Sequence, residues 1–155
     1  MIRIFSLIAL IVILLVAGCA PSPQATPAAT PTLPVLTNEW TIRMIHSGGI
    51  MGLMRSVEVS SDGSYTVVDE RKQDKATGKL AADELKKLGS IIASAKLNTT
   101  NIPGGGVCAD CFIYDIEIQS SGKNLTVQLS DITLPDSGME ELVAFLRRLI
   151  DSALK

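Results

Sequence analysis

The sequence of 155 residues predicts an α+β fold: an antiparallel sheet of about five strands with two helices packed on one face. Alternating apolar and polar residues recur in short segments that end at Gly-containing turns, which is typical of half-buried antiparallel strands. Two longer segments instead repeat apolar residues every three or four positions, as amphipathic helices do. The expected order is β-β-β-α-β-β-α, and the length suits one folded domain.

Three strands are expected first, over residues 40–46, 53–60 and 65–71. The first strand is rich in β-formers and stops at a Ser-Gly-Gly break, where glycine permits a tight reversal. The second strand alternates and places Val57 and Val59 on one face. The Ser-Asp-Gly-Ser sequence at 61–64 predicts a hairpin turn into the third strand. The polar residues 74–78 that follow are expected to form a loop.

A helix is expected over residues 81–97, because Leu85, Leu88 and Ile92 fall on one helical face. A long Gly-rich loop follows, and residues 112–119 and 124–130 then alternate across a short Gly turn, which predicts an antiparallel hairpin. A closing helix is expected from residues 135–138 to about residue 153, with an apolar stripe along one side.

The N-terminus predicts export and lipid attachment. Residues 4–17 form an apolar run of about 14 residues, which fits a signal peptide and falls short of the ~20 that span a bilayer. The run closes in Leu15-Val16-Ala17-Gly18-Cys19, which resembles the lipobox of bacterial lipoprotein precursors. That resemblance implies a signal peptide over 1–18, a lipid on Cys19, and a protein anchored to the bacterial membrane or cell envelope. An uncleaved anchor helix and a lipid-free secreted protein are the alternatives.

Residues 19–37 are expected to be the lipidated cysteine and a tether rich in Pro, Thr and Ala, and residues 38–155 the folded domain. Five of the seven prolines of the chain lie in this short segment, which has no charged or aromatic side chain. Such a composition favours semi-rigid polyproline II and buries no core. The tether would hold the domain roughly 20 to 55 Å from the membrane.

Charge and composition exclude several function classes. Removal of Arg3 with the signal peptide leaves 13 basic against 16 acidic side chains, and no basic run is longer than two residues. This balance argues against nucleic acid as a partner, because phosphate binding needs concentrated positive charge. His46 is the only histidine of the chain, and no nucleophile motif or phosphate-binding loop is present. We therefore expect a non-enzymatic domain without a cofactor or a metal.

Two cysteines, Cys108 and Cys111, form a Cys-x-x-Cys motif just before an expected strand. In an exported protein the plain interpretation is a local disulfide. A zinc site that adds His46 is one alternative, and redox catalysis is another, although a thioredoxin-type motif opens a helix rather than a strand.

The domain resembles the emfourin family in the order and spacing of several short motifs. The matching segments are residues 42–52 (Ile-Arg-Met-Ile-His-Ser-Gly-Gly-Ile-Met-Gly), 80–88 with an acidic pair, 110–114 at a strand entry, a Gly turn and the closing Leu-rich helix. Characterised emfourins are small proteinaceous inhibitors of protealysin- and thermolysin-type metallopeptidases. The resemblance implies a similar fold and a secreted or envelope metallopeptidase as partner. A binding or structural envelope lipoprotein with an unrelated ligand is the alternative function.

The expected partner-binding loop consists of Ser47, Gly48, Gly49, Ile50 and Met51. An apolar side chain on a Gly-flanked reversal can project from a rigid sheet into a cleft of a partner. The opposite expectation is that Ile50 and Met51 fold back into the core. Ile50 stands where the emfourins often have Phe, so it keeps an apolar tip without the ring.

Overall fold

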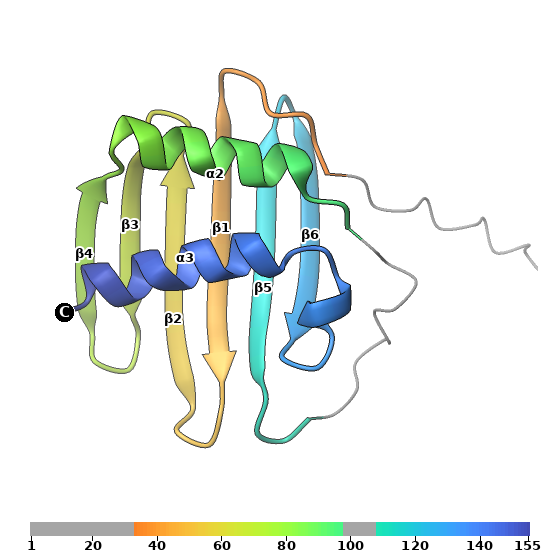
Figure 1. Cartoon of the computed structure of the whole chain (residues 1–155). Coiled ribbons are helices and arrows are strands. Elements are labelled where there is room, and N and C mark those ends of the chain that lie inside the picture. The colour runs from red at the N-terminus through yellow and green to blue at the C-terminus, as the bar shows by residue number, and fades with distance from the viewer. Residues whose placement is uncertain (1–32, 98–107) are drawn as a thin grey trace, which may run out of the picture.

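The computed structural model describes residues 33–97 and 108–155, which form a six-stranded antiparallel sheet with two helices on one of its faces (Figure 1). This architecture confirms the α+β class with an antiparallel sheet and two helices, but the sheet has six strands rather than the expected five. The elements are β1 (Trp40–Gly48), β2 (Leu53–Ser60), β3 (Ser64–Asp69), β4 (Asp74–Lys79), α2 (Ala82–Ser94), β5 (Phe112–Ser120), β6 (Lys123–Ser130), the 3-10 helix η1 (Leu134–Asp136) and α3 (Glu140–Ala153).

The strands are arranged in the order β4-β3-β2-β1-β5-β6, and all neighbours are antiparallel. The first four strands form a meander that ends at one edge. Helix α2 then carries the chain across the sheet, so that the β5–β6 hairpin adds on the other side of β1 (Figure 1). β1 is therefore a central strand, paired along its whole length with β5 and along most of it with β2.

Alternation along the strands explains why one face is covered. In β1 the side chains of Ile42 and Met44 are fully buried, whereas Arg43 between them is exposed. Met44 is opposite Val57 in β2 and Ile116 in β5, and both of these are fully buried too. The buried rows pack against the apolar stripes of the helices, because an antiparallel sheet with one apolar face needs a layer above it.

Both helices carry the expected stripes. In α2 the buried residues are Leu88, Ile91 and Ile92, and in α3 they are Leu142, Val143, Phe145, Leu146, Leu149 and Ile150. The N-cap of α2 is Ala81, which has no polar side chain to offer. The Glu84 carboxylate instead accepts a hydrogen bond from the Ala81 backbone N–H at 3.1 Å, which satisfies a donor next to the first turn of the helix.

The expected loop at residues 74–78 is wrong, since Asp74–Lys79 forms strand β4. The turn before it is held by Asp69, whose carboxylate accepts hydrogen bonds from the backbone N–H groups of Arg71 (3.2 Å) and Lys72 (3.1 Å). Asp69 is 2% exposed and also pairs with Arg55 at 2.9 Å. The sequence does not predict β4 because it is an edge strand with few buried side chains. Its residues therefore show no alternation of apolar and polar side chains.

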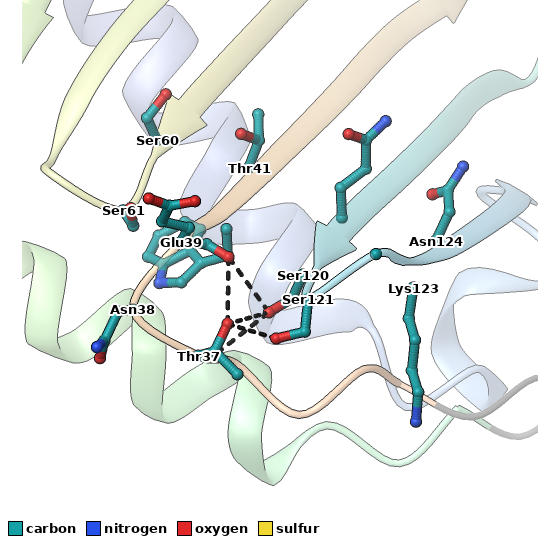
Figure 2. A pocket seen from close by; sticks show the side chains of 13 residues that line it. Thr37, Asn38, Glu39, Thr41, Ser60, Ser61, Ser120, Ser121, Lys123 and Asn124 are labelled. Atoms are coloured by element: carbon teal, nitrogen blue, oxygen red, sulfur yellow. Dashed lines mark hydrogen bonds between the residues drawn. The ribbon is translucent and has the colours of Figure 1, made fainter.

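The end of the expected tether lies on the domain rather than apart from it. Leu33 and Leu36 pack against the core, and Thr37 is fixed to the β5–β6 turn (Figure 2). The Thr37 backbone N–H donates to the Ser120 hydroxyl at 3.1 Å, and the Ser121 hydroxyl donates to the Thr37 hydroxyl at 2.7 Å. The chain therefore enters the domain across the β5–β6 turn, next to the start of β1.

Candidate functional site

The expected partner-binding residues Ser47, Gly48, Gly49, Ile50 and Met51 lie where β1 reverses into β2. Ile50 is 86% exposed and Met51 is 78% exposed. Of the two alternatives raised by the sequence, the structure shows side chains that project into solvent. Two adjacent large apolar groups at this exposure leave most of their surface available for contact with a partner.

Glycine is required at this reversal. Gly48 and Gly49 have φ values of +95° and +68°, which side chains rarely adopt. A Cβ on Gly48 would collide with the carbonyl oxygen of Cys111, and one on Gly49 would lie 2.6 Å from the Phe112 ring. The Gly49 N–H donates to that same Cys111 carbonyl at 3.0 Å, and the Gly52 N–H donates to the Gly49 carbonyl at 2.8 Å. The reversal is thus fixed against the entry to β5.

The Cys-x-x-Cys segment contacts the reversal through the Cys111 carbonyl. Cys108 and Cys111 are joined by a disulfide, with Cα atoms 5.4 Å apart. Because both sulfurs are bonded to each other, neither is a thiolate ligand or nucleophile in this state. Gly48 pairs with Phe112 in the β1–β5 register, so the disulfide loop lies directly beside the reversal.

Two further exposed apolar side chains lie near the same end of the sheet, and no sequence pattern distinguishes them. Met54, in β2, is 48% exposed, and Ile132, just after β6, is 67% exposed. Asp131 holds the second of these segments, because its N–H donates to the Phe112 carbonyl and its carboxylate accepts from the Phe112 N–H at 3.0 Å. Alternation identifies buried positions, but it does not indicate which isolated apolar residues stay exposed.

We call Ile50, Met51, Met54 and Ile132 the apolar rim. The rim lies at the end of the sheet that is drawn lowest in Figure 1.

A buried aromatic and polar cluster supports the rim from inside. His46, directly before the reversal, is 6% exposed and packs against the rings of Phe112 and Tyr114, at centroid distances of 4.9 and 5.0 Å. The Tyr114 hydroxyl donates to Asp131 at 2.9 Å and accepts from Arg147 at 3.3 Å. The buried His46 Nε2 has no hydrogen-bond partner within the described residues.

The surroundings keep the imidazole of His46 and the phenol of Tyr114 uncharged. Burial, followed by the positive charge of Arg147, lowers the pKa of His46 to about 4, against a smaller opposing effect of Asp131. Burial and the hydrogen bond to Asp131 raise the pKa of Tyr114 to about 12. At neutral pH the imidazole and the phenol are therefore both neutral, and they act as packing groups under the reversal.

No protein-family model and no curated protein matches this chain. The resemblance to the emfourins therefore remains a prediction from the sequence. Within residues 33–97 and 108–155, no three His, Cys, Asp or Glu side chains are grouped to hold a metal ion. No helix in the same ranges is long and apolar enough to cross a bilayer. Cys19, the expected lipidation site, lies outside the described residues.

Proposed function

We propose that this protein is a lipid-anchored, exported binding domain without catalytic chemistry of its own, and that the apolar rim contacts a partner protein. The observation that carries the proposal is the exposure of Ile50 and Met51 on a reversal fixed by backbone hydrogen bonds. A loop that is already ordered loses little conformational entropy on binding, so more of the contact energy appears as affinity.

The rim and the tether lie at opposite ends of the domain. The chain reaches the sheet at Thr37, beside the start of β1, and β1 then runs nine residues to the reversal. At about 3.3 Å per residue, this separates the two ends by roughly 27 Å. If Cys19 carries the anchor, the rim faces away from the membrane. This orientation favours a partner in the space beyond the membrane over the lipid surface itself.

The emfourin resemblance supplies the partner class, a secreted or envelope metallopeptidase of the thermolysin type. Protease–inhibitor interfaces are compact, and they use preorganised loops that enter a cleft. An apolar side chain at the tip of a rigid reversal suits such a cleft. Burial of an Ile side chain contributes about 1.5 to 3 kcal/mol, or about 10- to 150-fold in affinity.

The test uses the chain from Ala20 onward, which lacks the expected lipidation site Cys19. Thermolysin inhibition and direct binding would be measured for this form, for Ile50→Asp and for Val35→Asp. Val35 is the matched control, because it is an equally exposed apolar residue (82%) at the tether end. We expect Ile50→Asp to weaken inhibition at least tenfold and Val35→Asp to leave it unchanged, with both variants melting like the parent chain.

Two results would overturn the proposal at different levels. Absence of inhibition and of binding at high micromolar protein rejects a metallopeptidase as the partner class. Equal losses from Ile50→Asp and Val35→Asp would show that the rim is not the contact surface.

A further inference from the structure

A hollow of about 930 Å³ opens at the end of the sheet opposite the rim, where the chain enters the domain (Figure 2). Residues 37–41, the end of β2 and the β5–β6 turn surround it. Thr41, Gln119 and Asn124 form one row across β1, β5 and β6 in the strand register. Thr41 precedes the buried Ile42, so this row lies on the sheet face that no helix covers. The volume lies within the range of small-molecule sites.

The lining of the hollow is polar but almost uncharged. Six of its side chains carry hydroxyls and three carry carboxamides, with one carboxylate (Glu39), one ammonium (Lys123) and the indole of Trp40. A phosphate ligand needs several cations, and a hard metal ion needs several carboxylates. A single charge of each sign satisfies neither. The lining instead matches a neutral ligand that offers many hydroxyl and amide groups.

Two acceptors in the hollow are oriented in advance. The Glu117 carboxylate accepts hydrogen bonds from Gln119 Nε2 at 2.8 Å and from Asn124 Nδ2 at 3.0 Å. A carboxylate can only accept, so both amides must turn their NH₂ groups toward it. Their carbonyl oxygens then point elsewhere, and neither makes a hydrogen bond within the part of the chain that the structure describes. Both are therefore available to donors of a ligand.

Hydrogen bonds also hold the backbone around the hollow in place. The Ser120 hydroxyl, in a residue only 3% exposed, donates to the Val35 carbonyl at 3.1 Å and accepts from the Thr37 N–H. The Ser61 N–H donates to the Trp40 carbonyl at 2.9 Å, which joins the end of β2 to the start of β1. A polar site whose backbone is held in this way needs little ordering when a ligand enters.

We propose that this hollow binds a neutral oligosaccharide built from N-acetylated hexosamines. Sugar hydroxyls and the acetamido N–H would pair with Thr41 and with the carbonyl oxygens of Gln119 and Asn124. Trp40 has the same orientation as the buried Ile42 and packs against the core on the helix-covered face, so its indole takes no part in this polar row. The source of the ligand rests on the proposed function: a domain tethered outside a bacterial membrane meets the N-acetylhexosamine polymer of the wall, and the hollow lies at the tethered end.

The experiment is an NMR titration of the ¹⁵N-labelled chain from Ala20 with the tetramer of N-acetylglucosamine, with a glucose tetramer and inorganic phosphate as comparison probes. We expect saturable shifts around Thr41, Gln119 and Asn124 for the acetylated sugar, with a Kd on the order of 0.1 to 1 mM, and no saturable shifts with phosphate. Asn124→Leu and Thr41→Val should each weaken binding severalfold, and together at least tenfold. Thr126→Val, on the same face but outside the hollow, is the control and should bind like the parent.

Shifts that do not saturate by about 10 mM acetylated tetramer overturn the proposal. Saturable shifts confined to other parts of the domain, or an equal effect of Thr126→Val and Asn124→Leu, overturn it as well. Equal affinity for the glucose tetramer rejects the acetylated class. The Ile50→Asp variant should keep full sugar binding, so a failure of the rim and a failure of the hollow are separately visible.

Discussion

Acid should destabilise this domain through one residue, His46. Its imidazole is buried against two aromatic rings, and it has no partner for a proton on Nε2 in the described structure. Protonation would place a positive charge there, with the Arg147 and Arg55 guanidinium groups nearby and only partial compensation from Asp131 and Asp151. The unfolded chain can take up the same proton in water without this cost. Folding and protonation of His46 therefore oppose each other.

The magnitude follows from the two pKa values. The pKa of His46 is about 4 in the folded state, against an ordinary value of 6.5. Above pH 7 both states are neutral at this residue, and stability does not depend on its proton. As the pH falls below 6.5 the unfolded chain binds the proton first, so stability declines by about 2 kcal/mol at pH 5 and about 3 kcal/mol at pH 4. At about 3 to 5 °C per kcal/mol, the Tm should fall by roughly 6 to 10 °C between pH 7.5 and pH 5.

The assay compares the parent chain with His46→Phe, which keeps an aromatic ring in the same place and cannot titrate. Urea unfolding at pH 7.5 and pH 5 gives the free energy of unfolding for each protein. Most carboxyl groups titrate below this window, and His46 is the only histidine of the sequence, so the difference between the two proteins isolates one group. The parent should lose about 2 kcal/mol over this range, and His46→Phe should lose much less.

Equal pH dependence of the unfolding free energy in the two proteins would rule out this role of His46. An NMR titration in which the single imidazole of the folded parent has a midpoint near 6.5 would rule it out as well. Either result would mean that the ring is accessible to water, and that the cluster under the reversal is open.

Three other predictions follow from the same geometry. Gly48→Ala should destabilise the domain by about 2 kcal/mol or more, because it adds a side chain at φ +95° against the Cys111 carbonyl, and urea unfolding measures this. Reduction of the Cys108–Cys111 disulfide should cost no more than about 2 kcal/mol, since the loop is so short, and a calorimetric scan with and without a dithiol reductant checks it. Cys19→Ser should move the protein from the membrane fraction to the soluble fraction of expressing bacteria, and retention in the membrane would reject lipid anchoring.

Most of the fold can be predicted from the sequence because most strands have one solvent-exposed face and one buried face. Val57 and Val59 in β2, and Leu125 and Leu129 in β6, are buried as their alternation predicts. β4 could not be found in this way, because only a strand that buries apolar groups shows the period of two. Its pairing depends on β3 and on the turn held by Asp69, and neither leaves an apolar pattern in residues 74–79.

The candidate site was only partly visible in the sequence, and the reason is strand order. Paired glycines locate the reversal at Ser47–Gly52, and the Cys-x-x-Cys motif together with the expected export suggests the disulfide. Nothing local indicates that β5 pairs with β1, yet that pairing puts Cys111 against Gly49 and Ile132 near the same end of the sheet as Ile50. Long-range pairing of this kind is set by the packing of the whole sheet, so it has no short-range signature.

The same strand order places different surfaces at the two ends of the domain. β1 lies between β2 and β5, so the β1–β2 reversal and the disulfide loop meet at its far end, beside the exposed apolar rim. At its near end the incoming chain and the β5–β6 turn gather around a polar hollow instead. On the proposed lipid anchoring, attachment at the near end would leave the far end open to a diffusing partner and would hold the polar end close to the anchor. The proposed rim contact and the proposed sugar site therefore lie at opposite ends of one strand, so each can be tested without disturbing the other.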